Sequence, residues 1–94
     1  MVKLDFLSKE YLFSLDTDTK LYLIENNVSL DVFVYDDDLI VRKNVAEHGY
    51  SLHILMYDES WYVRLAVAKQ GYMSSIMKYD KDARVSAEAK RHLS

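Results

Sequence analysis

The sequence contains no cysteine and no proline, and its only glycines are Gly49 and Gly71. Without cysteine, the 94-residue chain has no disulfide, no thiolate metal site and no cysteine nucleophile, which is typical of a reducing compartment. It also lacks an apolar run of the roughly 18 residues that a membrane span requires, and Asp5 interrupts the N-terminal stretch where a signal peptide would be continuous. These absences predict a cytoplasmic protein that does not associate with a membrane.

The composition is that of one soluble globular domain, with 50% hydrophobic and 29% charged residues. The net charge of −3 is unevenly distributed: residues 1–47 hold ten acidic and five basic side chains, whereas residues 48–94 hold five acidic and seven basic ones. Nucleic-acid affinity depends mostly on a surplus of basic side chains. The charge balance therefore argues against direct nucleic-acid binding.

The sequence repeats itself at a spacing of 22 residues, as the segments YDDDLIVRKNVAEHGY and YDESWYVRLAVAKQGY illustrate. The frame extends upstream, with Phe13 in the tyrosine column and Asn27 in the glycine column. It divides a single domain, residues 1–94, into an N-terminal segment 1–12 and the units 13–34, 35–56, 57–78 and 79–94. Three columns recur in three units: Tyr35, Tyr57 and Tyr79; Asp36, Asp58 and Asp80; Val41, Val63 and Val85.

Each unit is predicted to form a long helix followed by a short one. The long helix should end at Asn27, Gly49 or Gly71, since these residue types tolerate a left-handed backbone. The seven residues that follow, 28–34, 50–56 and 72–78, make only about two turns, so we expect a short α- or 3₁₀-helix there. Side chains able to cap the long helix share one column: Asp16, Asp38, Ser60 and Asp82.

A unit of this size cannot bury its own apolar face, so its stability must come from its neighbours. We therefore expect an all-α fold, a right-handed α-solenoid of four units. The outer units should be atypical because one side of each faces water. They differ from the inner units in a pair of residues six apart, which is Asp36–Arg42 and Asp58–Arg64 inside but Ser14–Lys20 and Asp80–Ser86 outside.

The pattern D-x-[DS]-x-x-V-R-x-x-V-A-x-x-G, at 36–49 and 58–71, resembles HEAT-like repeats. At this unit length it is closer to the variant leucine-rich repeat, which alternates a long α-helix with a short helical one, and the resemblance covers residue 13 onwards. It implies a ladder of acidic and basic side chains along the stacked helices. The ladder would consist of Asp36, Asp58, Arg42 and Arg64, with Asp80 as a further member. The prolines common in these repeats are absent, and no cysteine could hold the iron–sulfur cluster known in one such protein, so we expect no cofactor.

The arginine column has two interpretations. Guanidinium groups bind phosphates well. However, Arg42 and Arg64 each have an aspartate at the spacing of the ladder, and a paired arginine has few donors left for a ligand. We therefore interpret this column as structural.

No residue pattern indicates catalysis or metal binding. Within the run Asp36-Asp37-Asp38, two carboxylates are already assigned to the ladder and to a cap, and no EF-hand spacing accompanies them. His48 and His53 are five residues apart, a spacing that does not place both on one helix face. No nucleophile motif such as G-x-S-x-G occurs. We expect a non-enzyme without a metal.

The eight tyrosines are the most unusual part of the composition. Tyr35, Tyr57 and Tyr79 recur in one column, and Tyr50 and Tyr72 in another. We predict that both columns pack between units, with each hydroxyl reaching water or a carbonyl.

The first two positions of the long helices vary too much in volume to be tightly packed, since they hold Leu39-Ile40, Trp61-Tyr62 and Ala83-Arg84. Leu39, Ile40, Trp61 and Tyr62, called the edge patch below, would then form an exposed apolar surface of the kind found at interface hot spots. The alternative is that Trp61 only covers the start of its helix.

These features predict a non-catalytic protein–protein interaction module, a small adaptor or inhibitor, with a protein partner. An alternative is an acidic decoy that imitates a phosphate backbone and blocks a nuclease or another nucleic-acid-binding protein. Its carboxylates would come from the N-terminal half: Asp16, Asp18, Asp31, Asp36, Asp37 and Asp38. A third function, HEAT-like DNA binding or repair, would depend on Arg42, Arg64 or Arg84.

Overall fold

The computed structural model describes residues 8–94; residues 1–7 of the predicted N-terminal segment 1–12, Asp5 included, lie outside the described residues. The described part is all-α and holds eight helices. After α1 (Lys9–Ser14), nine-residue and four-residue helices alternate, which confirms the predicted pairs of long and short helices. The long ones are α2 (Thr17–Glu25), α4 (Leu39–Glu47), α6 (Trp61–Lys69) and α8 (Ala83–Arg91), and the short ones are α3 (Leu30–Phe33), α5 (Leu52–Leu55) and α7 (Ser74–Met77).

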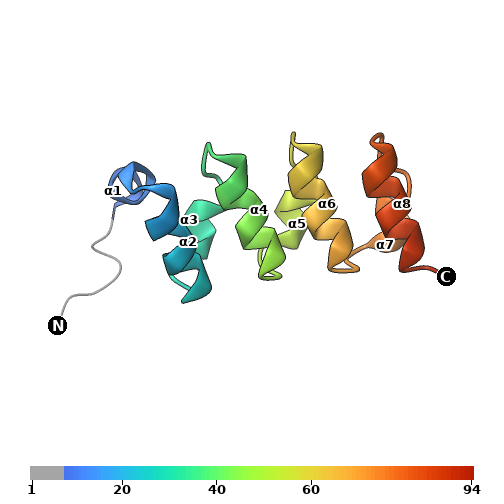
Figure 1. The fold of residues 1–94 in the computed structure, drawn as a ribbon, viewed down its shortest axis with the longest axis horizontal. Coiled ribbons are helices and arrows are strands. Elements are labelled where there is room, and N and C mark those ends of the chain that lie inside the picture. The colour runs from blue at the N-terminus through green and yellow to red at the C-terminus, as the bar shows by residue number, and fades with distance from the viewer. Residues whose placement is uncertain (1–7) are drawn as a thin grey trace.

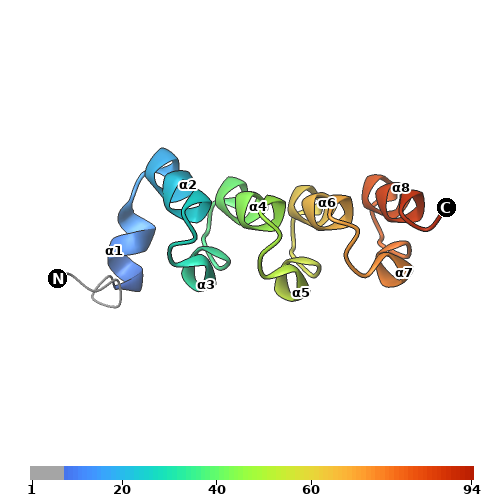
Figure 2. The same cartoon turned by 90° about the horizontal axis from the view of Figure 1, so that it is seen from below.

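The helices form two rows along an elongated molecule of 50 × 21 × 18 Å. The long helices stand side by side in chain order (Figure 1), and the short helices form a second row beside them (Figure 2). Each long helix packs against the next long helix: α2 against α4, α4 against α6, and α6 against α8. Contacts are therefore mostly local in the sequence, an arrangement consistent with repeats.

Capping residues define the starts of all four long helices and the ends of the first three, as predicted. The side chains of Asp16, Asp38, Ser60 and Asp82 each accept a hydrogen bond from a backbone N–H in the first turn. Beyond the other end, Asn27, Gly49 and Gly71 have positive φ angles of 62°, 78° and 75°. The chain reverses there because these residue types adopt the left-handed region at small cost.

A second left-handed residue precedes each short helix, and the sequence did not predict it. Ser29, Ser51 and Met73 have φ angles of 57°, 55° and 48°, and none of them caps its helix through its side chain. Serine and methionine have no intrinsic preference for this conformation. We therefore attribute the left-handed conformation of these residues to the packing of the short helices against the long ones.

The core runs as a line between the two rows of helices. Val41, Val63 and Val85, one column of the repeat, are completely buried. Phe33, Leu55 and Met77 meet them from the short helices, and Leu12 extends the core into α1. Since α1 crosses the boundary predicted between residues 12 and 13, the end of the N-terminal segment is part of the packed structure. None of the described helices has the length and apolar character needed to cross a membrane.

Candidate interaction surfaces

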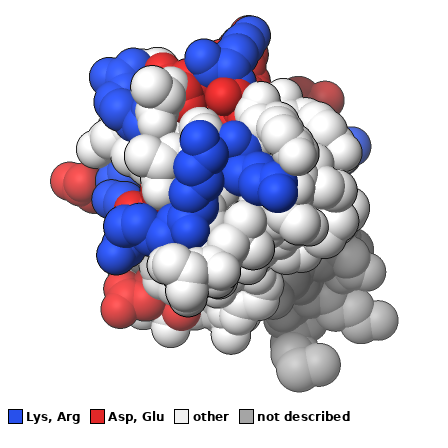
Figure 3. Space-filling view, turned by 90° about the vertical axis from the view of Figure 1, so that its right-hand side faces the viewer, with Lys and Arg blue, Asp and Glu red and all other residues white. Residues whose placement is uncertain are grey.

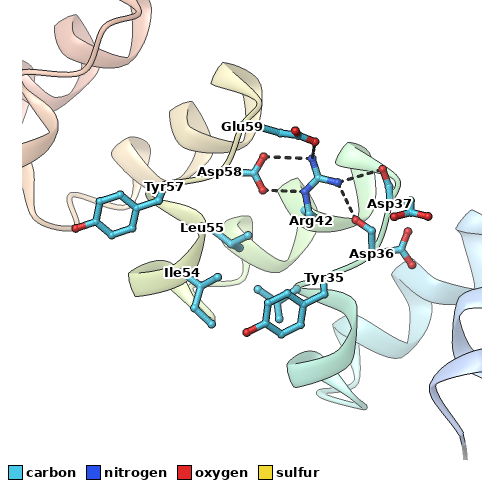
Figure 4. Close-up of a pocket in the computed structure, with 10 residues that line it drawn as sticks. Tyr35, Asp36, Asp37, Arg42, Ile54, Leu55, Tyr57, Asp58 and Glu59 are labelled. Carbon is cyan, nitrogen blue, oxygen red and sulfur yellow. Dashed lines mark hydrogen bonds and ion pairs between the residues drawn. The ribbon is translucent and has the colours of Figure 1, made fainter.

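Ion pairs join consecutive units through their acidic and basic side chains (Figure 4). Arg42 donates from Nε to Asp58 Oδ2 at 2.8 Å and from Nη2 to Asp58 Oδ1 at 3.2 Å. Arg64 contacts Asp80 in the same way, at 2.9 and 3.3 Å. In the first unit the partner of Asp36 is Lys20, whose Nζ lies 2.8 Å from Oδ2. Each basic residue therefore pairs with the aspartate 16 positions later, in the next unit.

The third nitrogen of each guanidinium group, Nη1, is engaged within its own unit. Arg42 Nη1 donates to the carbonyl oxygens of Asp36 and Asp37 at 2.7 and 3.1 Å, and Arg64 Nη1 donates to that of Asp58 at 2.7 Å. The hydrogen bond to Asp58 raises the pKa of Arg42, against the opposing effect of burial. Since both guanidinium groups are almost fully buried, they are not placed to bind phosphates.

The ladder stops at both ends of the stack. In the columns that would continue it, Ser14 and Ser86 donate hydrogen bonds of 2.6 Å to the carbonyl oxygens of Tyr11 and Lys78. Lysine and arginine side chains gather at the C-terminal end (Figure 3), and α8 exposes Arg84, Lys90 and Arg91 there. The excess of basic over acidic side chains in residues 48–94 is therefore concentrated at this end of the molecule.

Three members of the edge patch are exposed at the starts of α4 and α6: Leu39 at 37%, Ile40 at 42% and Tyr62 at 36%. Trp61 is half-buried and packs against the core. Its ring lies 5.4 Å from that of Tyr62, edge to face. Arg84 covers it with a guanidinium carbon 3.4 Å from the ring centroid, a cation–π contact. Trp61 therefore packs at the start of its helix, contacts the patch member Tyr62, and has one ring face covered by Arg84.

The same Arg84 pairs with the cap of α8. Its Nη2 and Nε atoms donate to the two carboxylate oxygens of Asp82 at 2.8 and 3.1 Å. These hydrogen bonds lower the pKa of Asp82 from its ordinary 3.8 to about 2. The exposed arginine is thus already partnered by a carboxylate and an indole.

The predicted acidic surface is smaller than the sequence suggested. Asp36 is only 3% exposed because it pairs with Lys20, so it does not contribute to such a surface. Asp38 is half-buried and accepts hydrogen bonds from Ile40 N and Thr17 Oγ1. The carboxylates that remain exposed are Asp16, Asp18, Asp31 and Asp37.

The tyrosine columns behave differently from each other. The prediction of packing between units is wrong for Tyr35, Tyr57 and Tyr79, which are 64%, 75% and 78% exposed. The core is filled instead by the residues just before them, such as Phe33 and Leu55. Packing between units is confirmed for Tyr50, whose hydroxyl donates to Asn27 Oδ1 of the preceding unit at 2.6 Å.

The exposed tyrosines border a depression between the second and third units, an open groove of about 380 Å³ (Figure 4). Sequence reasoning missed this feature, although the recurrence of tyrosine one residue before the ladder aspartate was a usable signal. We call it the tyrosine groove. It is lined by Val34, Tyr35, Asp36, Asp37, Arg42, Ile54, Leu55, Tyr57, Asp58 and Glu59.

Residues 8–94 contain no group of three or more His, Cys, Asp or Glu side chains that could hold a metal ion. Comparison with known proteins finds no matching family model, no matching curated protein and no matching solved structure.

Proposed function

We propose that the chain is a right-handed α-solenoid of four units with the architecture of HEAT-like and variant leucine-rich repeats. The alternation of long and short helices supports this architecture, as do the four helix caps in one column. The ladder supports it further, because Arg42 and Arg64 each connect their own unit to the next one.

We further propose that the protein is a non-catalytic protein–protein interaction module, a small adaptor or inhibitor. The observation that carries this proposal is the exposure of Leu39, Ile40 and Tyr62 at the starts of two neighbouring long helices. Contiguous apolar and aromatic side chains on a surface are the composition of interface hot spots. A partner that buries them would gain apolar contact with little rearrangement of the stack.

The two other functions have less support. An acidic decoy would rely on exposed carboxylates, and Asp36 and Asp38 are engaged within the molecule. DNA binding would rely on arginines, and Arg42 and Arg64 are largely buried with all three guanidinium nitrogens hydrogen-bonded within the molecule. Both functions remain distinguishable outcomes of the same experiment.

The experiment captures partners of the tagged full-length protein from nuclease-treated lysate of its source cells, at low and at high salt. Ile40→Ser removes an exposed side chain of the edge patch, and Ile76→Ser is the matched control because Ile76 is similarly exposed, at 47%, outside the patch. We expect a partner that persists at high salt and is lost with Ile40→Ser but kept with Ile76→Ser.

Other results would point elsewhere. A nucleic-acid-binding protein that elutes with salt from both variants would favour the acidic decoy. Partners found only in untreated lysate, together with duplex binding that depends on Arg84, would favour a DNA-binding protein. Equal loss of the partner in both variants would contradict a role for the edge patch.

A further inference from the structure

We propose that the tyrosine groove binds an arginine side chain presented by a partner protein. This inference goes beyond the proposed function, because it concerns a second surface and specifies the chemistry of the residue that the surface accepts.

The aromatic part of the groove has unoccupied ring faces. Tyr35 and Tyr57 are mostly exposed, and Ile54 lies between them in Figure 4. None of the cation–π contacts within residues 8–94 involves Tyr35 or Tyr57. The third tyrosine of the column differs, because Lys78 Nζ lies 5.0 Å from the centroid of Tyr79. The molecule itself thus makes at Tyr79 the cation–π contact that a guest would make at Tyr35 or Tyr57.

The charge of the groove is negative once the internal pairs are taken into account. The positive charge of Lys20 balances the negative charge of Asp36, and that of Arg42 balances that of Asp58. The carboxylates of Asp37 and Glu59 remain, and both are exposed; that of Glu59 is 91% exposed and lies 3.9 Å from Arg42. Two carboxylates and two tyrosine rings that line one groove complement a guanidinium group, which stacks on aromatic faces and pairs with carboxylates. The same carboxylates repel a phosphate.

The corresponding position one unit further along has the opposite character. The column of Asp37 and Glu59 continues with Lys81, and the column of Val34 and Met56 continues with Lys78. Near Tyr79 the chain therefore supplies its own cations. This difference predicts that an arginine binds between the second and third units and not between the third and fourth.

The test is to titrate the isotope-labelled full-length protein with two blocked peptides and to monitor the amide chemical shifts of the protein. One is Gly-Ser-Arg-Ser-Gly, and the other carries citrulline, which has nearly the same shape without the charge. We expect the arginine peptide to shift amides of residues 35–37, 54 and 57–59 in a saturable manner. We expect the citrulline peptide to bind at least about fivefold more weakly, in line with the loss of one cation–π contact and one ion pair.

Matched variants locate the site. Tyr57→Ala and Asp37→Asn should each lower the affinity for the arginine peptide about fivefold. Tyr79→Ala and Asp31→Asn, which remove an equally exposed tyrosine and an exposed carboxylate elsewhere, should leave its affinity unchanged. All four side chains are exposed, so the variants should fold.

Equal binding of the two peptides, absence of saturable shifts, or equal losses in the matched variants would overturn the proposal. So would stronger binding of a peptide that carries phosphoserine in place of arginine. The peptide titration and the partner capture test different surfaces. If the arginine peptide binds but no partner is captured, only the function proposed for the edge patch is contradicted. A captured partner without arginine binding would contradict only the groove.

Discussion

Arg64 holds two units together through three oxygen atoms: the carbonyl oxygen of Asp58 in its own unit and both carboxylate oxygens of Asp80 in the next unit. Lys20 occupies the same column in the first unit and makes a single contact, to Asp36. The difference follows from side-chain geometry, because a planar guanidinium has several donors in fixed directions and an ammonium is a point charge. The junctions between the second and third units and between the third and fourth units therefore use arginine, whereas a lysine is sufficient at the first junction.

Substitution Arg64→Lys should lower the free energy of unfolding by about 1–2 kcal/mol, since the hydrogen bond to Asp58 and the bidentate geometry are lost. Arg64→Met should lower it by about 2–4 kcal/mol, because Asp80 is then left as an unpaired, largely buried carboxylate. Urea unfolding followed by circular dichroism measures both effects. Arg91→Lys, at an exposed ion pair with Glu88, is the control and should cause no measurable change. Equal effects at residues 64 and 91 would contradict a structural role for the ladder.

The low pKa of Asp82 predicts a pH dependence of stability. The pKa is about 2 in the folded protein and near 3.8 when the group is free, so the unfolded chain takes up the proton first as the pH falls. The stabilisation is therefore complete above about pH 5 and is lost progressively as the pH falls through the folded pKa of about 2. Asp82→Asn keeps a capping side chain but removes the charge. The difference in unfolding free energy between the parent and this variant should be constant at pH 6 and above and should shrink steadily as the pH falls from about 5 through 2; a difference that does not change with pH would refute the assignment.

At the scale of elements, the two kinds of helix owe their positions to different causes. Each long helix has a side-chain cap at its start, and a left-handed Asn or Gly follows α2, α4 and α6, so these limits follow from residue types. A short helix begins at a left-handed serine or methionine without a side-chain cap. Four residues make one turn and would not be stable alone. The short helices therefore exist because Phe33, Leu55 and Met77 are buried against the long ones.

The strained entry to α7 offers a stabilising substitution. Met73 has a φ angle of 48° and is 43% exposed, so Met73→Gly removes strain and loses only part of a side chain's buried contact. We expect the unfolding free energy to rise by about 0.5–1 kcal/mol. Ser75→Gly, two residues later within α7, is the matched control and should lower it by a similar amount. Thermal unfolding of the two variants tests this, and destabilisation by both would mean that Met73 is not strained.

At the scale of the whole molecule, each unit contacts its neighbours and little else. The helix α6 lies between α4 and α8, whereas α8 packs mainly against α6 and α7 in the described part of the chain. Stability in such a stack is a sum of units and of interfaces between neighbours. An inner unit has two interfaces and the last unit has one.

Hydrogen exchange should therefore be graded along the molecule. We expect the amides of Val67 and Ala68 in α6 to exchange at least about tenfold more slowly than those of Glu88 and Ala89 in α8, because α8 opens without disturbing α4. Amide exchange followed residue by residue measures this gradient. Uniform protection from α4 to α8 would show instead that the stack opens only as a whole.

The amino-acid sequence by itself determined the all-α class, the alternation of long and short helices, the four helix caps and the turns at Asn27, Gly49 and Gly71. These features depend on residues close in the chain, and the 22-residue period displays them several times. Only the tertiary structure decided that Arg42 pairs with Asp58 and not with the Asp36 side chain, that the column of Tyr35 faces solvent, and that a groove lies beside it. These features depend on how one unit sits against the next, and the period of a repeat does not contain that geometry.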